Sequence, residues 1–171
     1  MDVFEAIINR YSVRGFRPDP IPTEIIEKLL EAARQAPSAG NLQPWFFYVV
    51  QDQTKREQLA QAAKGQRFVA EAPLDIVICV EPEVSATRYH ERGANLYCLQ
   101  DTAIAAQNII LTATAEGLGS CWVGSFDEDQ ASQILDIPSG RRPIAIIALG
   151  YPAAQPRGTK RKELAEITEW V

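Results

Sequence analysis

Hydrophobic positions recur at helical spacing in several stretches of the chain. Residues 23–35 place Ile, Leu and Ala on one side of a helix, and Asp2 with Glu5 forms a capping-box pattern at the start of the chain. The longest stretch, residues 94–116, is apolar on more than one face, which is typical of a central helix or of one that packs against another subunit. The predicted helices are residues 2–9, 23–35, 54–63, 94–116 and 127–135, and Gly117 is the glycine expected to end the fourth of them.

Short continuous apolar runs alternate with these helices. Residues 45–50 and 74–81 are apolar almost throughout, which predicts strands that are covered on both faces. Residues 121–123 and 143–150 predict two further strands. We therefore expect one α+β domain over residues 1–171, in which helices flank a central mixed sheet.

The composition narrows the class of protein. A net charge of −5 and a pI near 5.0 argue against a general nucleic-acid binder, because such proteins need a basic face. The three cysteines show no C-x-x-C spacing, so neither a disulfide framework nor a zinc site is indicated. The chain shows neither the basic and apolar regions of a signal peptide nor an apolar stretch of membrane-spanning length, so we expect a cytoplasmic protein without a membrane partner.

Residues 36–45 connect a predicted helix to a predicted strand, and they form the segment around which we arrange the site. Pro37 stops the helix, and Pro44 removes a donor from the start of the strand. A loop held between rigid flanks is a common place for binding groups, although the same residue types also make ordinary turns. The polar groups between the two prolines belong to Ser38, Gly40, Asn41 and Gln43.

Basic residues gather at both ends of this acidic chain. In an extended segment Arg10, Ser12 and Arg14 would project to one side, which suits an anion, although a solvated edge strand would show the same pattern. Three basic residues lie within positions 10–17 and four within 157–162. If the fold brings these ends together, they form a pocket for a phosphate monoester; taken alone, the second group is a solvated charge run.

The chain is poor in catalytic side chains. Ser38 imitates the nucleophile of a G-x-S-x-G elbow, but that elbow needs a strand before the serine and a helix after it, and the order here is the reverse. His90 is the single histidine, which leaves no ligand spacing for a metal, and neither a P-loop nor a G-x-G-x-x-G is present. Amide, hydroxyl and guanidinium groups dominate instead, which favours a bound cofactor that performs the chemistry itself.

Four segments, in this order and across nearly the whole chain, resemble the short form of the nitroreductase family of FMN-dependent oxidoreductases. The family resemblance implies an FMN-binding fold and a homodimer with two FMN sites at the subunit interface. It also implies that the tail, residues 151–171, packs on the partner subunit. The four segments are residues 10–14, 37–45, 117–124 and 149–152, the last followed by a basic tail.

The resemblance also implies which residues meet the flavin. Arg10 and Ser12 would hold the phosphate and ribityl end with Arg161, and Arg14 would lie near flavin N1 and O2. The loop would reach the partner's flavin, and the backbone N–H groups after residue 123 would face N5. Many members of the family have two basic residues separated by one position in the tail, whereas Lys160, Arg161 and Lys162 are consecutive here. Which of these residues, or Arg157, meets the phosphate therefore stays open. The expected flavin-binding residues are Arg10, Tyr11, Ser12, Arg14, Pro37, Ser38, Ala39, Asn41, Gln43, Gln66, Gly124, Ser125 and Arg161.

The function that the resemblance implies is an FMN-dependent NAD(P)H oxidoreductase. It would reduce nitroaromatic or quinone-type oxidants by ping-pong hydride transfer through flavin N5, with no side chain acting as a required acid or base. A flavin-binding carrier or sensor without turnover, flavin cleavage and dehalogenation are the alternatives. The choice between NADH and NADPH stays open, as does the substrate, which depends on the segment expected to cap the pocket, residues 82–95. We expect residues 82–93 to be irregular.

Overall fold

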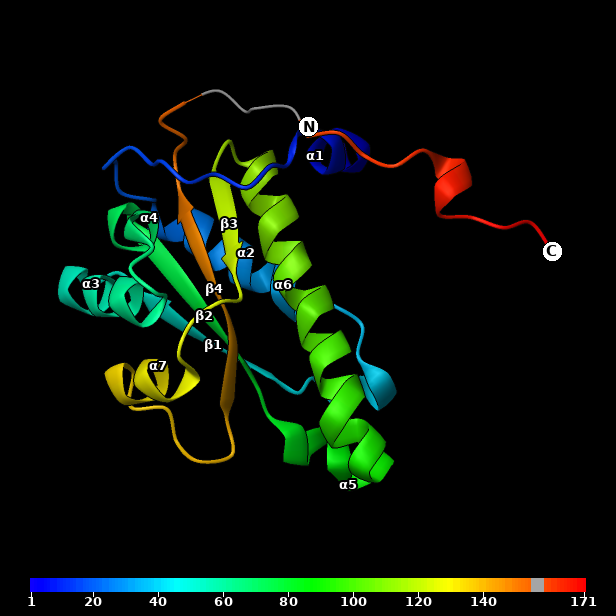
Figure 1. Ribbon diagram of the computed structural model, residues 1–171. Helices are drawn as coiled ribbons and strands as arrows, with labels where there is room; N and C mark the ends of the chain where they lie inside the picture. Colours follow the sequence, from blue (N-terminus) through cyan, green and yellow to red (C-terminus); the bar gives the residue numbers. More distant parts are fainter. Residues whose placement is uncertain (155–158) are drawn as a thin grey trace.

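A computed structural model describes residues 1–154 and 159–171, so the prediction for Arg157 lies outside the described residues. Four strands form one sheet in the order β1-β2-β4-β3 (Figure 1). Every neighbouring pair of these strands is antiparallel. The strands are β1 (Trp45–Val50), β2 (Leu74–Val80), β3 (Gly119–Val123) and β4 (Arg142–Gly150).

Helices cover the two faces of the sheet, and each face has its own hydrophobic core. On one face, α2 and α6 bury leucine, isoleucine and alanine side chains against β2 and β4. On the other face, α3, α4 and α7 pack on the alternate residues of the same strands. The helices are α1 (Val3–Asn9), α2 (Thr23–Arg34), α3 (Gln53–Ala62), α4 (Arg67–Glu71), α5 (Pro82–Arg92), α6 (Cys98–Ala115) and α7 (Glu128–Ile134).

Helix α6 is the central helix, as its apolar pattern predicts. It runs along the sheet and contacts α1, α2, α5 and three of the strands (Figure 1). Gly117 adopts φ 76° just beyond its C-terminal end, which confirms the expected glycine stop. The capping box of Asp2 and Glu5 is also present at α1, where each side chain accepts a hydrogen bond from the other residue's backbone N–H.

The predicted mixed sheet is wrong, because the named strands are entirely antiparallel. Helices between strands often indicate parallel neighbours, but here α3 and α4 together return the chain to the end of the sheet that it left. Val50 at the end of β1 therefore pairs with Asp75 at the start of β2. Within the described residues, parallel pairing is limited to an isolated bridge between Ser12 and Ser120.

Two other expectations are corrected. Strand β1 is not covered on both faces: Phe46 is 36% exposed and Val49 is 39% exposed, because β1 is an edge strand and the helices centre on β2 and β4. Residues 82–93 are not irregular: residues 82–92 form α5, with Pro82 in the first turn, where proline is tolerated. A π-helical turn (Gly93–Tyr97) then joins α5 to α6. None of the helices in the described part of the chain has both the length and the hydropathy needed to cross a bilayer.

Candidate functional site

The basic N-terminal segment lies along the edge of the sheet. The backbone N–H of Val13 donates to the carbonyl oxygen of Ser120 in β3, at 2.9 Å, and Ser12 faces Ser120 in the isolated bridge. The Val13 side chain is buried, whereas Ser12 and Arg14 are exposed. The segment is therefore extended, as predicted, and its buried residue fixes it to the sheet.

The two basic ends of the chain meet at one cavity of about 690 Å³. Arg10, Ser12 and Arg14 line it from the N-terminal segment, and Arg161 lines it from the tail. The Tyr11 hydroxyl donates a 3.1 Å hydrogen bond to the carbonyl oxygen of Ala154, which ties the two segments together. A local concentration of positive charge thus exists on a chain whose net charge is −5.

Arg14 also lies near α4, which directly follows Gln66, another of the expected flavin-binding residues. The Arg14 guanidinium carbon lies 6.0 Å from the centre of the Phe68 ring in α4. Burial raises the pKa of the Cys121 thiol, and the positive charge of Arg14 opposes that rise. Immediately before α4, the Gln66 amide donates to the carbonyl oxygen of Ser125 at 3.3 Å. Gln66 and Ser125 therefore lie together, next to exposed Gly124 at the end of β3.

The loop of residues 36–45 is held in an unusual backbone conformation. Gly40, Asn41 and Gln43 have φ values of 60°, 57° and 52°, which lie in the left-handed region. The Ser38 hydroxyl accepts a 3.0 Å hydrogen bond from the backbone N–H of Gln43, and the Gln43 amide donates to the carbonyl oxygen of Asn41 at 3.3 Å. Pro37, Gly40, Asn41 and Gln43 are exposed and therefore available to a ligand.

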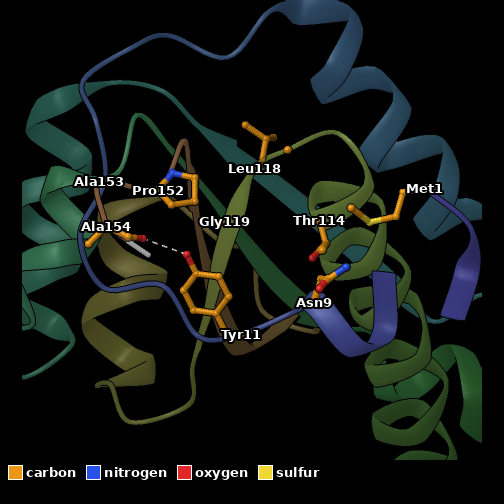
Figure 2. Close-up of a pocket in the computed structure, with 10 residues that line it drawn as sticks. Met1, Asn9, Tyr11, Thr114, Leu118, Gly119, Pro152, Ala153 and Ala154 are labelled. Atoms are coloured by element: carbon orange, nitrogen blue, oxygen red, sulfur yellow. Dashed lines mark hydrogen bonds between the residues drawn. The ribbon is translucent and has the colours of Figure 1, made fainter. Parts of the chain in front are cut away.

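The loop and the basic cavity lie at opposite ends of α6 within one chain. The Ala39 backbone N–H donates to the Asp101 carboxylate near the start of α6. Tyr11 lines a second cavity, of about 500 Å³, together with Thr114 near the end of that helix (Figure 2). Thirteen residues of α-helix correspond to about 20 Å, so a single chain does not bring the two groups together.

The donors at the basic cavity fit the phosphate end of FMN. Arginine guanidinium groups bind phosphate oxygens in pairs, and a serine hydroxyl adds one further donor. Arg10, Arg161 and Ser12 supply these groups at a single cavity. Lys160 and Lys162 do not line this cavity.

Comparison with known proteins decides the family. The model of the nitroreductase family matches residues 7–67 and 62–151. The chain belongs to the nitroreductase family. It is 33% identical to an NADH dehydrogenase of Thermus thermophilus, across 99% of this chain and 96% of that protein.

Two solved structures of the nitroreductase family and its relatives share the fold over nearly the whole chain. A nitroreductase family protein of Streptococcus pneumoniae superimposes with a TM-score of 0.91 and 25% identity, and the match covers 99% of this chain and 100% of that one. An NADPH:FMN oxidoreductase of Vibrio harveyi, solved with NAD⁺, gives a TM-score of 0.90 and 27% identity over 98% and 76% of the two chains. The protein is therefore an oxidoreductase of the nitroreductase family with its α+β fold.

This nitroreductase-family chain also contains residues at the loop that the sequence analysis missed. Asp101 and Thr102 of α6 each form a hydrogen bond to the loop backbone. Arg88 and Tyr89 of α5 approach so closely that a Cβ on Gly40 would lie 2.8 Å from Arg88 Nη1 and 2.9 Å from the Tyr89 hydroxyl. The signal in the sequence was that Asp101 is the single charged residue of α6.

Proposed function

We propose that this nitroreductase-family oxidoreductase binds FMN and uses NADH or NADPH to reduce a small-molecule oxidant. The observation that supports this proposal most directly is the cavity at which Arg10, Ser12, Arg14 and Arg161 converge from the two ends of the chain. When bound, FMN would supply the redox chemistry, which is hydride transfer from the nicotinamide to an oxidant such as a nitroaromatic or a quinone.

The chain's own residues bind and orient the cofactor. Arg10 and Arg161 bind the phosphate as charged donors, and Ser12 donates from its hydroxyl. Tyr11 holds the tail segment in place through its hydrogen bond to Ala154. We assign Arg14 to the flavin N1 and O2 side, where a fixed positive charge favours the reduced ring.

The rest of the chain contributes contacts to the ring. Gln66 directly precedes α4, whose Phe68 ring lies 6.0 Å from the Arg14 guanidinium carbon, and the Gln66 amide donates to the Ser125 carbonyl oxygen. These contacts support a place for Gln66, Gly124 and Ser125 near the flavin ring. We assign the backbone N–H groups of Gly124 and Ser125 to flavin N5. No side chain is assigned as an acid or a base, so the protein acts by position and electrostatics.

Two copies of the chain complete the site. The loop lies about 20 Å along α6 from the basic segment, which places Pro37, Ser38, Ala39, Asn41 and Gln43 far from the phosphate site at Arg10 of their own chain. We propose that they contact the flavin of the partner subunit in a homodimer.

The surface of α1 supports this assembly. Phe4 is 69% exposed and Ile8 is 66% exposed, and they lie beside exposed Val3 and Ile7 on the same short helix. A soluble monomer rarely exposes so many large apolar side chains together, so we assign this face to the dimer interface. The tail beyond Glu163 also extends away from the sheet with exposed Leu164, which fits packing on a partner subunit (Figure 1).

The experiment that tests the function is purification followed by flavin titration and turnover. We expect a yellow protein, or one that takes up about one FMN per chain, and steady oxidation of NADH or NADPH when a quinone or a nitroaromatic is added. A colourless protein that takes up no FMN would contradict the proposal. Tight flavin binding without NAD(P)H oxidation would assign the chain to flavin carriage or sensing, and products from flavin or a halogenated substrate alone would assign another reaction.

A further inference from the structure

Asp101 is a buried carboxylate that accepts a hydrogen bond from the loop of residues 36–45. It is 6% exposed, in the first turn of the apolar helix α6. Burial raises the pKa of this carboxyl, and the hydrogen bond from the Ala39 backbone N–H opposes that rise. Burial of a carboxylate is costly unless the group is hydrogen-bonded, so the bond from the Ala39 N–H offsets part of the cost of burying Asp101.

The loop that donates this hydrogen bond has a backbone conformation that its residues do not favour by themselves. Asn41 and Gln43 occupy the left-handed region, which is unfavourable for residues other than glycine. Internal hydrogen bonds link Ser38, Asn41 and Gln43 to one another, but they do not fix the loop to the body of the protein.

Adjacent residues of α6 contact the loop at two points, and the backbone N–H of Glu81 also donates to the Pro44 carbonyl oxygen, at 2.9 Å. The Asp101 carboxylate accepts a 3.1 Å hydrogen bond from the Ala39 backbone N–H at one end. The Thr102 hydroxyl donates a 3.3 Å hydrogen bond to the carbonyl oxygen of Pro44 at the other end. Since Pro44 has this second anchor outside α6, Asp101 matters most at the Ala39 end of the loop.

We propose that Asp101 is a positioning residue that holds residues 37–43 in the conformation that binds the flavin of the partner subunit. This inference rests on the proposed function, because it takes the loop as part of the FMN site. Thr102 supports the same conformation from the other end. Neither side chain is proposed to contact the flavin.

Three variants test the inference. Asp101→Ala removes the acceptor, whereas Asp101→Asn keeps an oxygen that can accept the Ala39 N–H. Asn108→Ala is the matched control: it removes another hydrogen bond from α6 to the backbone, donated by the Asn108 amide to the carbonyl oxygen of Ala32 in α2, at 2.9 Å and away from the loop. Each variant is measured as the full-length protein, with FMN as the titrant.

We expect Asp101→Ala to raise the FMN Kd about tenfold or more, and Asp101→Asn to restore it to within about threefold of the parent value. In the flavin-free protein, exchange of the Ala39 amide hydrogen should be about tenfold faster in Asp101→Ala and near the parent rate in Asp101→Asn. Asn108→Ala should lower the thermal midpoint without changing the FMN Kd.

The outcomes separate this inference from the proposed function. If the parent protein binds no FMN, the proposed function fails. If the parent binds FMN and Asp101→Ala binds it equally well, the function stands and the inference is wrong. The inference is also wrong if Asp101→Asn is as weak as Asp101→Ala, or if Asn108→Ala weakens FMN binding as much, because then general destabilisation rather than the Ala39 bond would be responsible.

Discussion

Val13 and Ser120 are joined backbone to backbone, by a 2.9 Å hydrogen bond from the N–H of Val13 to the carbonyl oxygen of Ser120. This bond fixes the N-terminal segment against β3 and thereby places Arg10, Ser12 and Arg14 at the cavity that Arg161 also lines. The close approach depends on Gly119, where a Cβ would lie 2.9 Å from the Val13 Cβ.

Gly119→Ala is therefore expected to push the basic segment away from the sheet. Overpacking of this kind costs about 1–3 kcal/mol of stability, and the FMN Kd should rise because the arginines are displaced. The measurements are urea unfolding and flavin titration. Gly117→Ala is the control: it strains a residue with φ 76° but has open space around its Cβ, so it should lower stability and leave the FMN Kd unchanged.

Arg10→Ala should weaken FMN binding by about 1.5 kcal/mol or more, which is about tenfold in Kd, because it removes a charged donor from the phosphate. The loss should shrink as salt is added. Arg34→Ala removes an arginine on the exposed face of α2, where it pairs with Glu31. Equal FMN affinities for Arg10→Ala, Arg34→Ala and the parent protein would remove Arg10 from the site.

Phe4→Asp should disrupt the homodimer, because it places a charge in the exposed apolar face of α1. Sedimentation at micromolar protein should show a monomer, and flavin titration should show loss of the tight site. Gln61→Asp introduces the same charge on the exposed side of α3 and should leave both properties unchanged. If Phe4→Asp remains a dimer that binds FMN normally, then α1 is not the interface.

Asp75→Asn tests a second buried carboxylate. Asp75 in β2 is fully buried, and neither of its oxygens has a hydrogen-bond partner in the described part of the chain. Burial raises its pKa well above the usual range, and the charge of Arg56 opposes this only partly. The folded protein therefore binds the Asp75 proton more tightly than the unfolded chain does, so this residue makes the free energy of unfolding fall as pH rises above about 4.

Asp75→Asn removes that titration. The variant should be about as stable as the parent protein near pH 4 and more stable by about 1 kcal/mol or more at pH 7, as measured by urea unfolding at both pH values. Asp19→Asn, at an exposed ion pair with Arg17, should change little at either pH. A constant difference between Asp75→Asn and the parent protein across this range would show that Asp75 does not titrate as inferred.

The sequence predicts the local structure well where a few neighbouring residues determine the backbone conformation. The capping box of α1, the extended segment around Ser12 and the glycine after α6 all follow from neighbouring residues, and the structure confirms them. The direction of the strands did not follow, because it depends on how α3 and α4 pack together.

The candidate site was predictable in composition but not in arrangement. Its residues fall into two groups at opposite ends of α6, and only the tertiary structure shows that separation. Helix α5 was missed because its sequence is mostly polar and begins with Pro82. Proline interrupts a helix in its interior but is tolerated in the first turn, which is where Pro82 lies. Asp101 was missed because its partner is a backbone N–H in a loop 62 residues away.

Two chains build each FMN site in the proposed homodimer, and mixed dimers test this arrangement most directly. Arg10→Ala damages the phosphate end of the site. Gly40→Val damages the loop, because Gly40 has φ 60°, a backbone conformation that is strained for a β-branched residue. If the loop serves the partner's flavin, both homodimers bind FMN weakly, whereas a mixed dimer contains one undamaged site and binds one FMN with the parent Kd. A mixed dimer without a tight site would contradict the account.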